Sequence, residues 1–214
     1  MFCGIDEAGR GPVIGPLVVC GVAVDSDDVL RQIGVKDSKK LTPRKREELE
    51  PRILAAAKVE FVEVPAEEID AIRNVMTMNE LEARVFASII ERLEPEHAFL
   101  DAADANEDEF GRMVQSQLDR KIKITSKHKA DDTYPVVSAA SIIAKVNRDR
   151  YVRDIEKEIG QPIGSGYASD PKTIAFLNTW VTEKKALPPH CRKSWYTSKN
   201  IMNLKSLKSL DLFE

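Results

Sequence analysis

The sequence lacks the features that mark membrane, secreted and zinc-binding proteins. None of its segments approaches the roughly 18 consecutive apolar residues that a membrane-spanning helix needs. The N-terminal MFCGIDEAG has no basic segment leading into an apolar run, so it does not fit a secretory signal. The three cysteines, Cys3, Cys20 and Cys191, are odd in number and far apart, a spacing that predicts neither zinc ligands nor disulfides. We therefore expect reduced thiols in a cytoplasmic protein without membrane contact.

A strong positive charge is also missing. The formal net charge of −3 over 214 residues argues against a simple polycation that coats nucleic acid. The charge is nevertheless uneven, with acidic residues concentrated at 60–70 and 104–109, and basic residues at 36–46, 120–129 and 145–153. A protein that binds both metal ions and a polyanion needs an acidic centre inside a basic rim, and this distribution allows one.

Apolar and capping patterns predict an α/β domain with a mixed sheet and a helical C-terminal extension. Segments rich in Val, Ile and Leu, or alternating in polarity, predict strands at 2–6, 17–24, 59–64, 98–101 and 121–125. Cap residues and periodicity predict helices that begin at Thr42-Pro43, Thr77, about Asn106, Tyr134, Asp170-Pro171 and residue 190.

Local details sharpen these expectations. Pro51 is expected to kink or end the helix that begins at Pro43. The helix over 134–159 starts with VSAASIIAKV, whose small side chains let it approach a sheet closely. The helix from residue 190 is expected to reach about 204, and the last ten residues look like a tail.

Carboxylates stand at the ends of predicted strands and at the start of a predicted helix. Asp6-Glu7 and Asp101 each end an apolar strand, and Asp131 comes just before the long helix. Adjacent strand residues point to opposite faces, so Asp6 and Glu7 converge only where the pleat breaks, and Gly9 and Gly11 supply a break nearby. Taken singly, each acid is more simply a solvated turn residue. Together they form an oxygen-rich set that suits two Mg²⁺ ions acting on a phosphodiester.

Five segments, in order, carry a resemblance to a known family. They are GIDEAGRGPVIGPLV at the N-terminus, KDSKKLTP (36–43), LDAAD (100–104), KHKADDTYPVVSAASIIAKVNRD (127–149) and GSGYASDPKT (164–173). Together they resemble the ribonuclease HII family, and the 127–149 segment is similar to its archaeal members. The resemblance implies a ribonuclease H-like catalytic domain over 1–185, a helical extension over 186–205 and a tail over 206–214.

The resemblance also implies an activity and a metal site. A member would hydrolyse the RNA strand of RNA–DNA hybrids and cut at ribonucleotides embedded in duplex DNA, leaving 5′-phosphate and 3′-hydroxyl ends. By position, the metal-binding carboxylates would be Asp6, Glu7, Asp101 and Asp131, holding two Mg²⁺ or Mn²⁺ ions during catalysis. Asp104 and Asp132 are nearby acids that compete for these assignments, and a one-place error in the alignment would select Asp132 instead of Asp131.

The implied substrate contacts lie in two glycine-containing segments and on scattered polar residues. A backbone group can read the ribose 2′-hydroxyl only at close approach, which a Cβ would obstruct, so Gly9, Arg10 and Gly11 suit this role. Tyr167 is similar to a family tyrosine that packs on the sugar at the DNA side of the junction. The simpler alternatives are a tight glycine turn and a half-buried tyrosine. Family positions that approach phosphates or sugars are matched by Lys39, Asn79, Lys145 and Arg148.

The C-terminal Ser-Leu-Asp-Leu-Phe resembles the short motif by which replication proteins dock on the sliding clamp. Leu210 and Phe213 have the spacing of its two anchoring residues. The match is incomplete, because Leu207 stands where glutamine is usual and Glu214 replaces a second aromatic residue. An amphipathic end that folds back or frays is the alternative. No heptad pattern or apolar stripe predicts assembly, so we expect a monomer.

Two rival functions remain open from the sequence. One is a different nuclease of the same superfold, such as a resolvase or integrase, which would lack the Gly-Arg-Gly segment beside Asp6-Glu7 and the Tyr167 loop. The other is a protein that binds hybrids without cutting them. Four clustered carboxylates would repel a nucleic acid in a pure binding protein, and a cleavage assay with and without a chelator separates the two.

Overall fold

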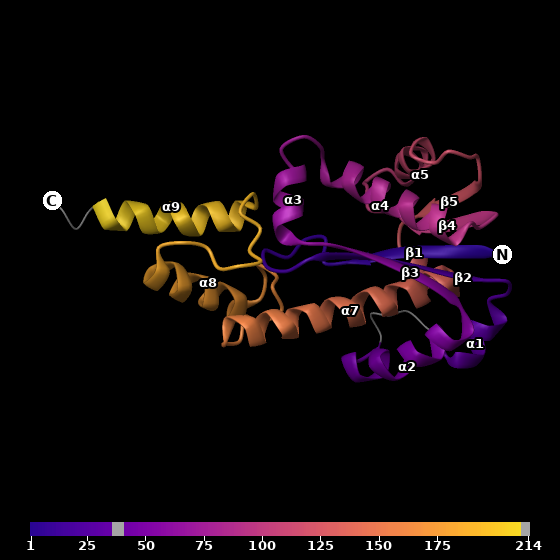
Figure 1. The fold of residues 1–214 in the computed structure, drawn as a ribbon, viewed down its shortest axis with the longest axis horizontal. Coiled ribbons are helices and arrows are strands. Elements are labelled where there is room, and N and C mark those ends of the chain that lie inside the picture. The colour runs from indigo at the N-terminus through magenta and orange to yellow at the C-terminus, as the bar shows by residue number, and fades with distance from the viewer. Residues whose placement is uncertain (36–40, 211–214) are drawn as a thin grey trace. The chain divides into compact units, whose positions relative to one another are not determined.

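The computed structural model describes residues 1–35 and 41–210, with side chains up to residue 203 (Figure 1). The elements follow one another as β1 (Phe2–Ala8), β2 (Leu17–Val24), α1 (Asp28–Ile33), α2 (Pro43–Ala56), β3 (Lys58–Val64), α3 (Ala66–Ile72), α4 (Met78–Leu93), β4 (His97–Asp101), α5 (Glu107–Ser116), β5 (Lys123–Lys127), α6 (Ala130–Thr133), α7 (Pro135–Ile159), α8 (Pro171–Lys184) and α9 (Tyr196–Leu210). The predicted α/β class is confirmed. None of the helices in the described part of the chain is long and apolar enough to span a bilayer.

The described strands form one five-stranded sheet in the order β3-β2-β1-β4-β5. Strand β1 pairs antiparallel with β2, whereas β1–β4 and β4–β5 are parallel, so the sheet is mixed as predicted. The register places Ile5 beside Leu100 on β4. Asp6 and Asp101 therefore follow directly after a paired position on two adjacent parallel strands.

The chain divides into two compact units whose segments alternate along the sequence. The first unit comprises residues 1–8, 18–63 and 76–147, and the second comprises 9–17, 64–75 and 148–214. Helix α7 thus has residues in both units. The division predicted at residues 185 and 205 stays a prediction.

In the first unit, helices cover both faces of the sheet (Figure 1). The start of α7 lies on one face, where a Cβ added to Gly4 would stand 2.4 Å from the backbone of Val136 and Val137. Helix α4 covers the other face, where a Cβ at Gly21 would meet Ile89 and Leu93. The predicted close approach of the Ala- and Ser-rich helix start to the sheet is confirmed.

The second unit has a hydrophobic core of its own. Buried residues from the 9–17 segment, the second half of α7, α8 and the C-terminal segment form one cluster, and they are Val13, Ile14, Val152, Ile155, Ile163, Phe176, Leu177, Val181, Cys191 and Ile201. Trp180 and Trp195 pack against it. All three cysteines of the chain are free and buried.

Four of the predicted helix starts are borne out in atomic detail. The Thr42 side chain accepts the Lys45 N–H, with Pro43 at the first helical position. Thr77 and Glu80 form both hydrogen bonds of a capping box at α4. Asn106 and Asp170 cap α5 and α8 with their side chains.

The structure corrects two predictions about helix ends. Of the two outcomes expected at Pro51, a kink or a helix end, the end is wrong, because α2 continues to Ala56. Proline removes one backbone hydrogen bond, and burial of Leu49 and Ile53 on either side of it holds the next turn in place. The last ten residues are also not wholly a tail, because α9 extends through Leu210.

Two element starts lie later than predicted. Strand β5 begins at Lys123 rather than 121, because the Ile122 N–H donates to the Gln115 side chain instead of to the sheet. Helix α9 begins at Tyr196 rather than near 190. The backbone N–H groups just before it, at Lys193 and Ser194, donate to the Asp70 carboxylate, which holds this segment as a loop.

Candidate metal centre

Three carboxylates converge in the first unit. Asp6, Asp101 and Asp131 each offer an oxygen, and these oxygens all lie within 4.8 Å of one another. Asp6 and Asp131 are 4% and 2% exposed, whereas Asp101 is half-buried. Asp101 can therefore be reached from solvent while the other two carboxylates are enclosed by protein.

Neighbouring elements set the positions of these side chains. Asp6 is on central strand β1, and Asp101 is the last residue of the adjacent parallel strand β4. One Asp101 oxygen accepts the Ala130 N–H at 3.0 Å, so the carboxylate that ends β4 also fixes the start of α6. Asp131 is the next residue of α6 and points inward, whereas Asp132 is exposed.

Hydrogen bonds and a nearby cation act on Asp6. Its carboxylate accepts the Glu7 N–H at 2.7 Å and a hydrogen bond from the Ser141 hydroxyl. Lys145 in turn donates to Ser141, one helical turn away on α7. Burial nevertheless raises the pKa of Asp6, helped by the charge of Asp131 and opposed by Lys145, Ser141 and the Glu7 N–H. A buried acid with a raised pKa lacks sufficient positive charge nearby, which a bound cation would supply.

Glu7 is not part of this three-carboxylate cluster. Strand β1 pairs regularly through Ala8, so the pleat does not break at Asp6-Glu7 as expected from Gly9 and Gly11. Asp6 shares the Gly4 face, on which α7 lies, and Glu7 shares the Ile5 face, covered by α4. A metal-binding role for Glu7 stays a prediction.

The Gly9–Gly11 segment lies in the second unit, and two other loops hold the residues that directly follow it. The Val13 and Ile14 N–H groups both donate to the Gly166 carbonyl, at 2.8 and 3.1 Å, and the Arg192 N–H donates to the Val13 carbonyl at 2.8 Å. Gly9 is buried and Gly11 is exposed. The ring of Tyr167 comes within 3.9 Å of where a Cβ on Gly11 would stand, so these two predicted contact sites are neighbours.

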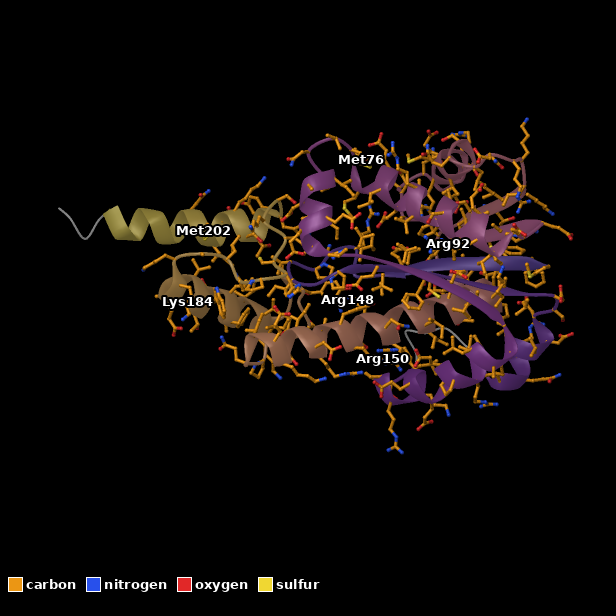
Figure 2. All side chains as sticks on the ribbon, in the orientation of Figure 1. Met76, Arg92, Arg148, Arg150, Lys184 and Met202 are labelled. Atoms are coloured by element: carbon orange, nitrogen blue, oxygen red, sulfur yellow. The ribbon has the colours of Figure 1, made fainter. Side chains whose placement is uncertain are left out.

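Arg148, on the second half of α7 (Figure 2), supports the Tyr167 loop. Its side chain is 5% exposed, donates to the Ser165 carbonyl at 2.8 Å and places Cζ 4.8 Å from the centre of the Tyr167 ring. It also packs where Gly9 and Gly166 lack side chains. In this arrangement Arg148 acts within the unit, and its predicted phosphate contact is untested.

Comparisons with known proteins identify the family of this chain. The sequence profile of the family described as Ribonuclease HII matches residues 3–198. The chain belongs to the ribonuclease HII family. It is 47% identical over 213 residues to the ribonuclease HII of Methanoregula boonei, a match that covers 100% of both chains.

Solved structures of similar proteins have the same fold as this chain. A ribonuclease HII of Archaeoglobus fulgidus, solved in complex with PCNA, is 43% identical with a TM-score of 0.87, covering 94% of this chain and 96% of that one. The ribonuclease H2 of Pyrococcus horikoshii OT3 is 40% identical with a TM-score of 0.87, covering 94% and 97%. The ribonuclease H-like fold and its C-terminal helices are thereby confirmed.

The other predicted contacts of this ribonuclease HII chain lie in varied settings. Lys39 falls outside the described residues, as does Phe213, and the side chain of Leu210 is likewise not described. Asn79, at the start of α4, donates a hydrogen bond to Asp104. Asp104 is the acid that the sequence offered as an alternative to Asp101. Lys145 bonds Ser141 beside Asp6.

Sequence reasoning missed two residues that hold these sites. Ser141 gave no signal beyond its small size, yet it links Lys145 to Asp6. Arg192 was unassigned, yet it is fully buried and donates to the Gly9, Arg10 and Gly15 carbonyls. Only the three-dimensional fold brings residues 177 or more positions apart into such contacts.

The raised pKa of Asp6 predicts that Asp6→Asn stabilises the metal-free protein. The folded state holds the Asp6 proton more tightly than the unfolded chain, so ionised Asp6 destabilises the fold at pH values above its folded pKa. In EDTA at pH 7.5 the variant should unfold about 3 °C higher than the parent. This gain should vanish as the pH falls below 3.8, the ordinary pKa, because Asp6 is then protonated in both states.

The matched control for this measurement is Asp132→Asn. Asp132 is exposed on the same structural segment, so its change should leave the unfolding temperature nearly unaltered. An Asp6→Asn protein that melts at or below the parent temperature at pH 7.5 would contradict the inferred electrostatics.

Proposed function

We propose that this ribonuclease HII chain hydrolyses the RNA strand of RNA–DNA hybrids and cuts at ribonucleotides embedded in duplex DNA, leaving 5′-phosphate and 3′-hydroxyl ends. Family membership makes it an endoribonuclease acting on RNA–DNA hybrids. The observation that carries the finer proposal is the convergence of Asp6, Asp101 and Asp131 within 4.8 Å. Three carboxylates would repel a phosphodiester unless cations lay between them and the substrate.

The donor set suits divalent cations of the Mg²⁺ and Mn²⁺ type. Such ions prefer oxygen ligands, and carboxylate oxygens are the atoms that converge. When bound, two ions supply an activated water and stabilisation of the charge that develops on the phosphodiester oxygens. In the proposal Asp6, Asp101 and Asp131 hold them, with Glu7 as a fourth ligand.

The residues around Asp6 keep its carboxylate oriented for this task. The Glu7 N–H and the Ser141 hydroxyl both donate to it, so its oxygens are fixed before any ion arrives. Lys145, which donates a hydrogen bond to Ser141, partly offsets the negative charge of Asp6. Among the three proposed aspartate ligands, Asp101 is the most exposed to solvent.

The adjacent pair Asp131 and Asp132 offers a sharp test of the metal site. Asp131→Asn should lower kcat for an RNA–DNA hybrid about a thousandfold, equivalent to about 4 kcal/mol, because a metal ligand is lost. Asp132→Asn, a change of the same kind at an exposed neighbour, should leave turnover within about twofold. Cleavage at saturating Mg²⁺, and again with a chelator, measures both.

Three outcomes would count against the proposal. Near-parental turnover of Asp131→Asn would remove Asp131 from the metal site. Cleavage that persists in excess chelator would contradict metal dependence, and tight hybrid binding without any cleavage would favour the rival reading of a non-cutting binding protein.

The Gly9–Gly11 segment is proposed to contact the ribose at the RNA–DNA junction. Gly9 is demanded by the fold, because its φ is +88° and a Cβ would stand 2.3 Å from the Pro16 carbonyl oxygen. The fold does not require a glycine at position 11. The φ of Gly11 is outside the left-handed region, and a Cβ there would meet only the Tyr167 ring at ordinary contact distance. An exposed glycine that folding does not need leaves room for a ligand to reach the backbone.

This difference predicts opposite behaviour for two alanine variants. Gly11→Ala should keep the parental stability but cut an embedded ribonucleotide about tenfold more slowly, the size of one lost hydrogen bond of about 1.5 kcal/mol. Gly9→Ala should instead destabilise the protein by about 2 kcal/mol. Urea unfolding together with cleavage of a duplex carrying one ribonucleotide tests the pair. Normal cleavage by Gly11→Ala would mean that the segment is only a turn.

Further substrate contacts complete the proposal. Tyr167 would pack against the sugar on the DNA side of the junction, with Arg148 holding its ring. Lys39, Asn79 and Lys145 would approach phosphates or sugars, contacts that position a duplex without reading its bases. A cytoplasmic, monomeric enzyme without membrane contact is part of the same proposal.

A sliding clamp is the proposed protein partner, bound through Leu210 and Phe213. A similar ribonuclease HII, from Archaeoglobus fulgidus, was solved in complex with PCNA, which is a sliding clamp. The pair of hydrophobic residues on a lysine-bearing C-terminal end suits a peptide that anchors in a groove. Tethering would raise the local concentration of the enzyme on DNA without altering its active site.

The double change Leu210→Ala, Phe213→Ala should abolish clamp binding and spare cleavage of short duplexes. Its matched control is Lys205→Ala, Lys208→Ala, which removes charge but keeps both hydrophobic residues. Titration of each protein against the PCNA of Archaeoglobus fulgidus measures binding. Unchanged binding of the first variant, or its loss of stability and activity together, would show that the end of α9 is a packing element.

A further inference from the structure

Arg192 is a fully buried cation whose hydrogen bonds go to main-chain carbonyls. Its exposure is 0%, and its three nitrogens donate to the Gly15 carbonyl (3.0 Å), the Arg10 carbonyl (2.7 Å) and the Gly9 carbonyl (2.5 Å). Within the described part of the chain, it forms no salt bridge with a carboxylate. Its positive charge is therefore balanced by carbonyl dipoles of the segment that begins at Gly9.

Trp195 extends this set of contacts by one residue. Its ring lies under the guanidinium, with Arg192 Cζ 4.9 Å from the ring centre, and its Nε1–H donates to the Gly11 carbonyl at 3.3 Å. The carbonyls of Gly9, Arg10 and Gly11 thus each accept a hydrogen bond from the Arg192–Trp195 pair. Three consecutive peptide groups are fixed in direction by two side chains.

Stability alone is a weak reason for such an arrangement. A buried charge loses its hydration, and apolar residues of similar volume often stabilise a protein as well or better. Burial and the nearby charge of Arg148 lower the pKa of Arg192 to about 10, so the guanidinium stays charged at neutral pH. Charge-assisted hydrogen bonds are, however, strong and directional, and suit a loop whose backbone must be held in one conformation.

We infer that Arg192 is a positioning residue for substrate discrimination, which, with Trp195, holds the Gly9–Gly11 backbone in the conformation that meets the ribose 2′-hydroxyl. This inference rests on the proposed function of that segment. Arg192 itself is buried and touches no substrate. Its effect passes through the loop, because backbone groups read a single hydroxyl only when they are held to within about 0.5 Å.

Binding to two duplexes that differ by one oxygen atom tests the inference. In an Asp101→Asn background, which is expected not to cut, dissociation constants are measured for an all-DNA duplex and for the same duplex with one ribonucleotide. Arg192→Lys keeps the charge but replaces three nitrogens in a planar fork with one ammonium nitrogen, which cannot reach all three carbonyls in their present directions. It should lower the preference for the ribonucleotide about tenfold and leave binding of the all-DNA duplex within twofold. Trp195→Phe, which loses only the Gly11 bond, should lose less.

A neighbouring variant controls for general loosening of this segment. Ser194→Ala removes the hydrogen bond from the Ser194 hydroxyl to Asp70 without touching the Gly9–Gly11 segment. It should keep the parental preference. Thermal unfolding sets a working temperature at which every variant is folded. If Arg192→Lys does not fold, Arg192→Gln, which is neutral and keeps one amide donor, takes its place with the same expectation.

The outcomes separate the inference from the function on which it rests. If the parent binds both duplexes equally, the proposed ribose contact of the Gly9–Gly11 segment fails, and the inference fails with it. If the parent discriminates and the Arg192 variant discriminates equally well, the inference alone is overturned. It is also overturned if Ser194→Ala loses as much preference as the Arg192 variant, because the effect is then one of stability.

Discussion

The contact between Gly4 and the start of α7 is the constraint on which the metal centre depends. A side chain at Gly4 would overlap the backbone of Val136 and Val137, so the helix lies directly on the central strand. That closeness brings Ser141, further along α7, within hydrogen-bonding distance of Asp6. The Ala- and Ser-rich start of the helix has the same purpose, since bulky residues there would push α7 off the sheet.

Much of the fold could be predicted because local chemistry decides it. The caps at Thr42 and Thr77 depend on residues within one helical turn, and both are confirmed. Predictions failed where distant groups compete with local ones. Pro51 suggested a helix end, but packing of its neighbours prevailed, and the start of α9 shifted because Asp70, more than 120 residues earlier, takes the backbone N–H groups before it.

The same distinction applies to the candidate site. The resemblance of their segments selected Asp101 and Asp131, and the structure adds that Asp131 is buried whereas Asp132 is exposed, a difference that no local pattern encodes. The missing break in strand β1 separates Glu7 from the cluster, although glycines nearby suggested otherwise. Arg192 was not predictable, since its role exists only once residues 9–15 and 192 are in contact.

The alternation of the two units along the chain has a consequence for how the protein is synthesised. Strand β1 leaves the ribosome well before its parallel partner β4, which follows about 90 residues later. The 9–17 segment must wait longer still, because Gly166 and Arg192, which hold it, lie more than 140 residues later in the sequence. The first unit cannot close before residue 147 is made, and the 9–17 segment cannot be held before Arg192 is made, so the protein is expected to fold late, with β1 needing protection from aggregation in the meantime.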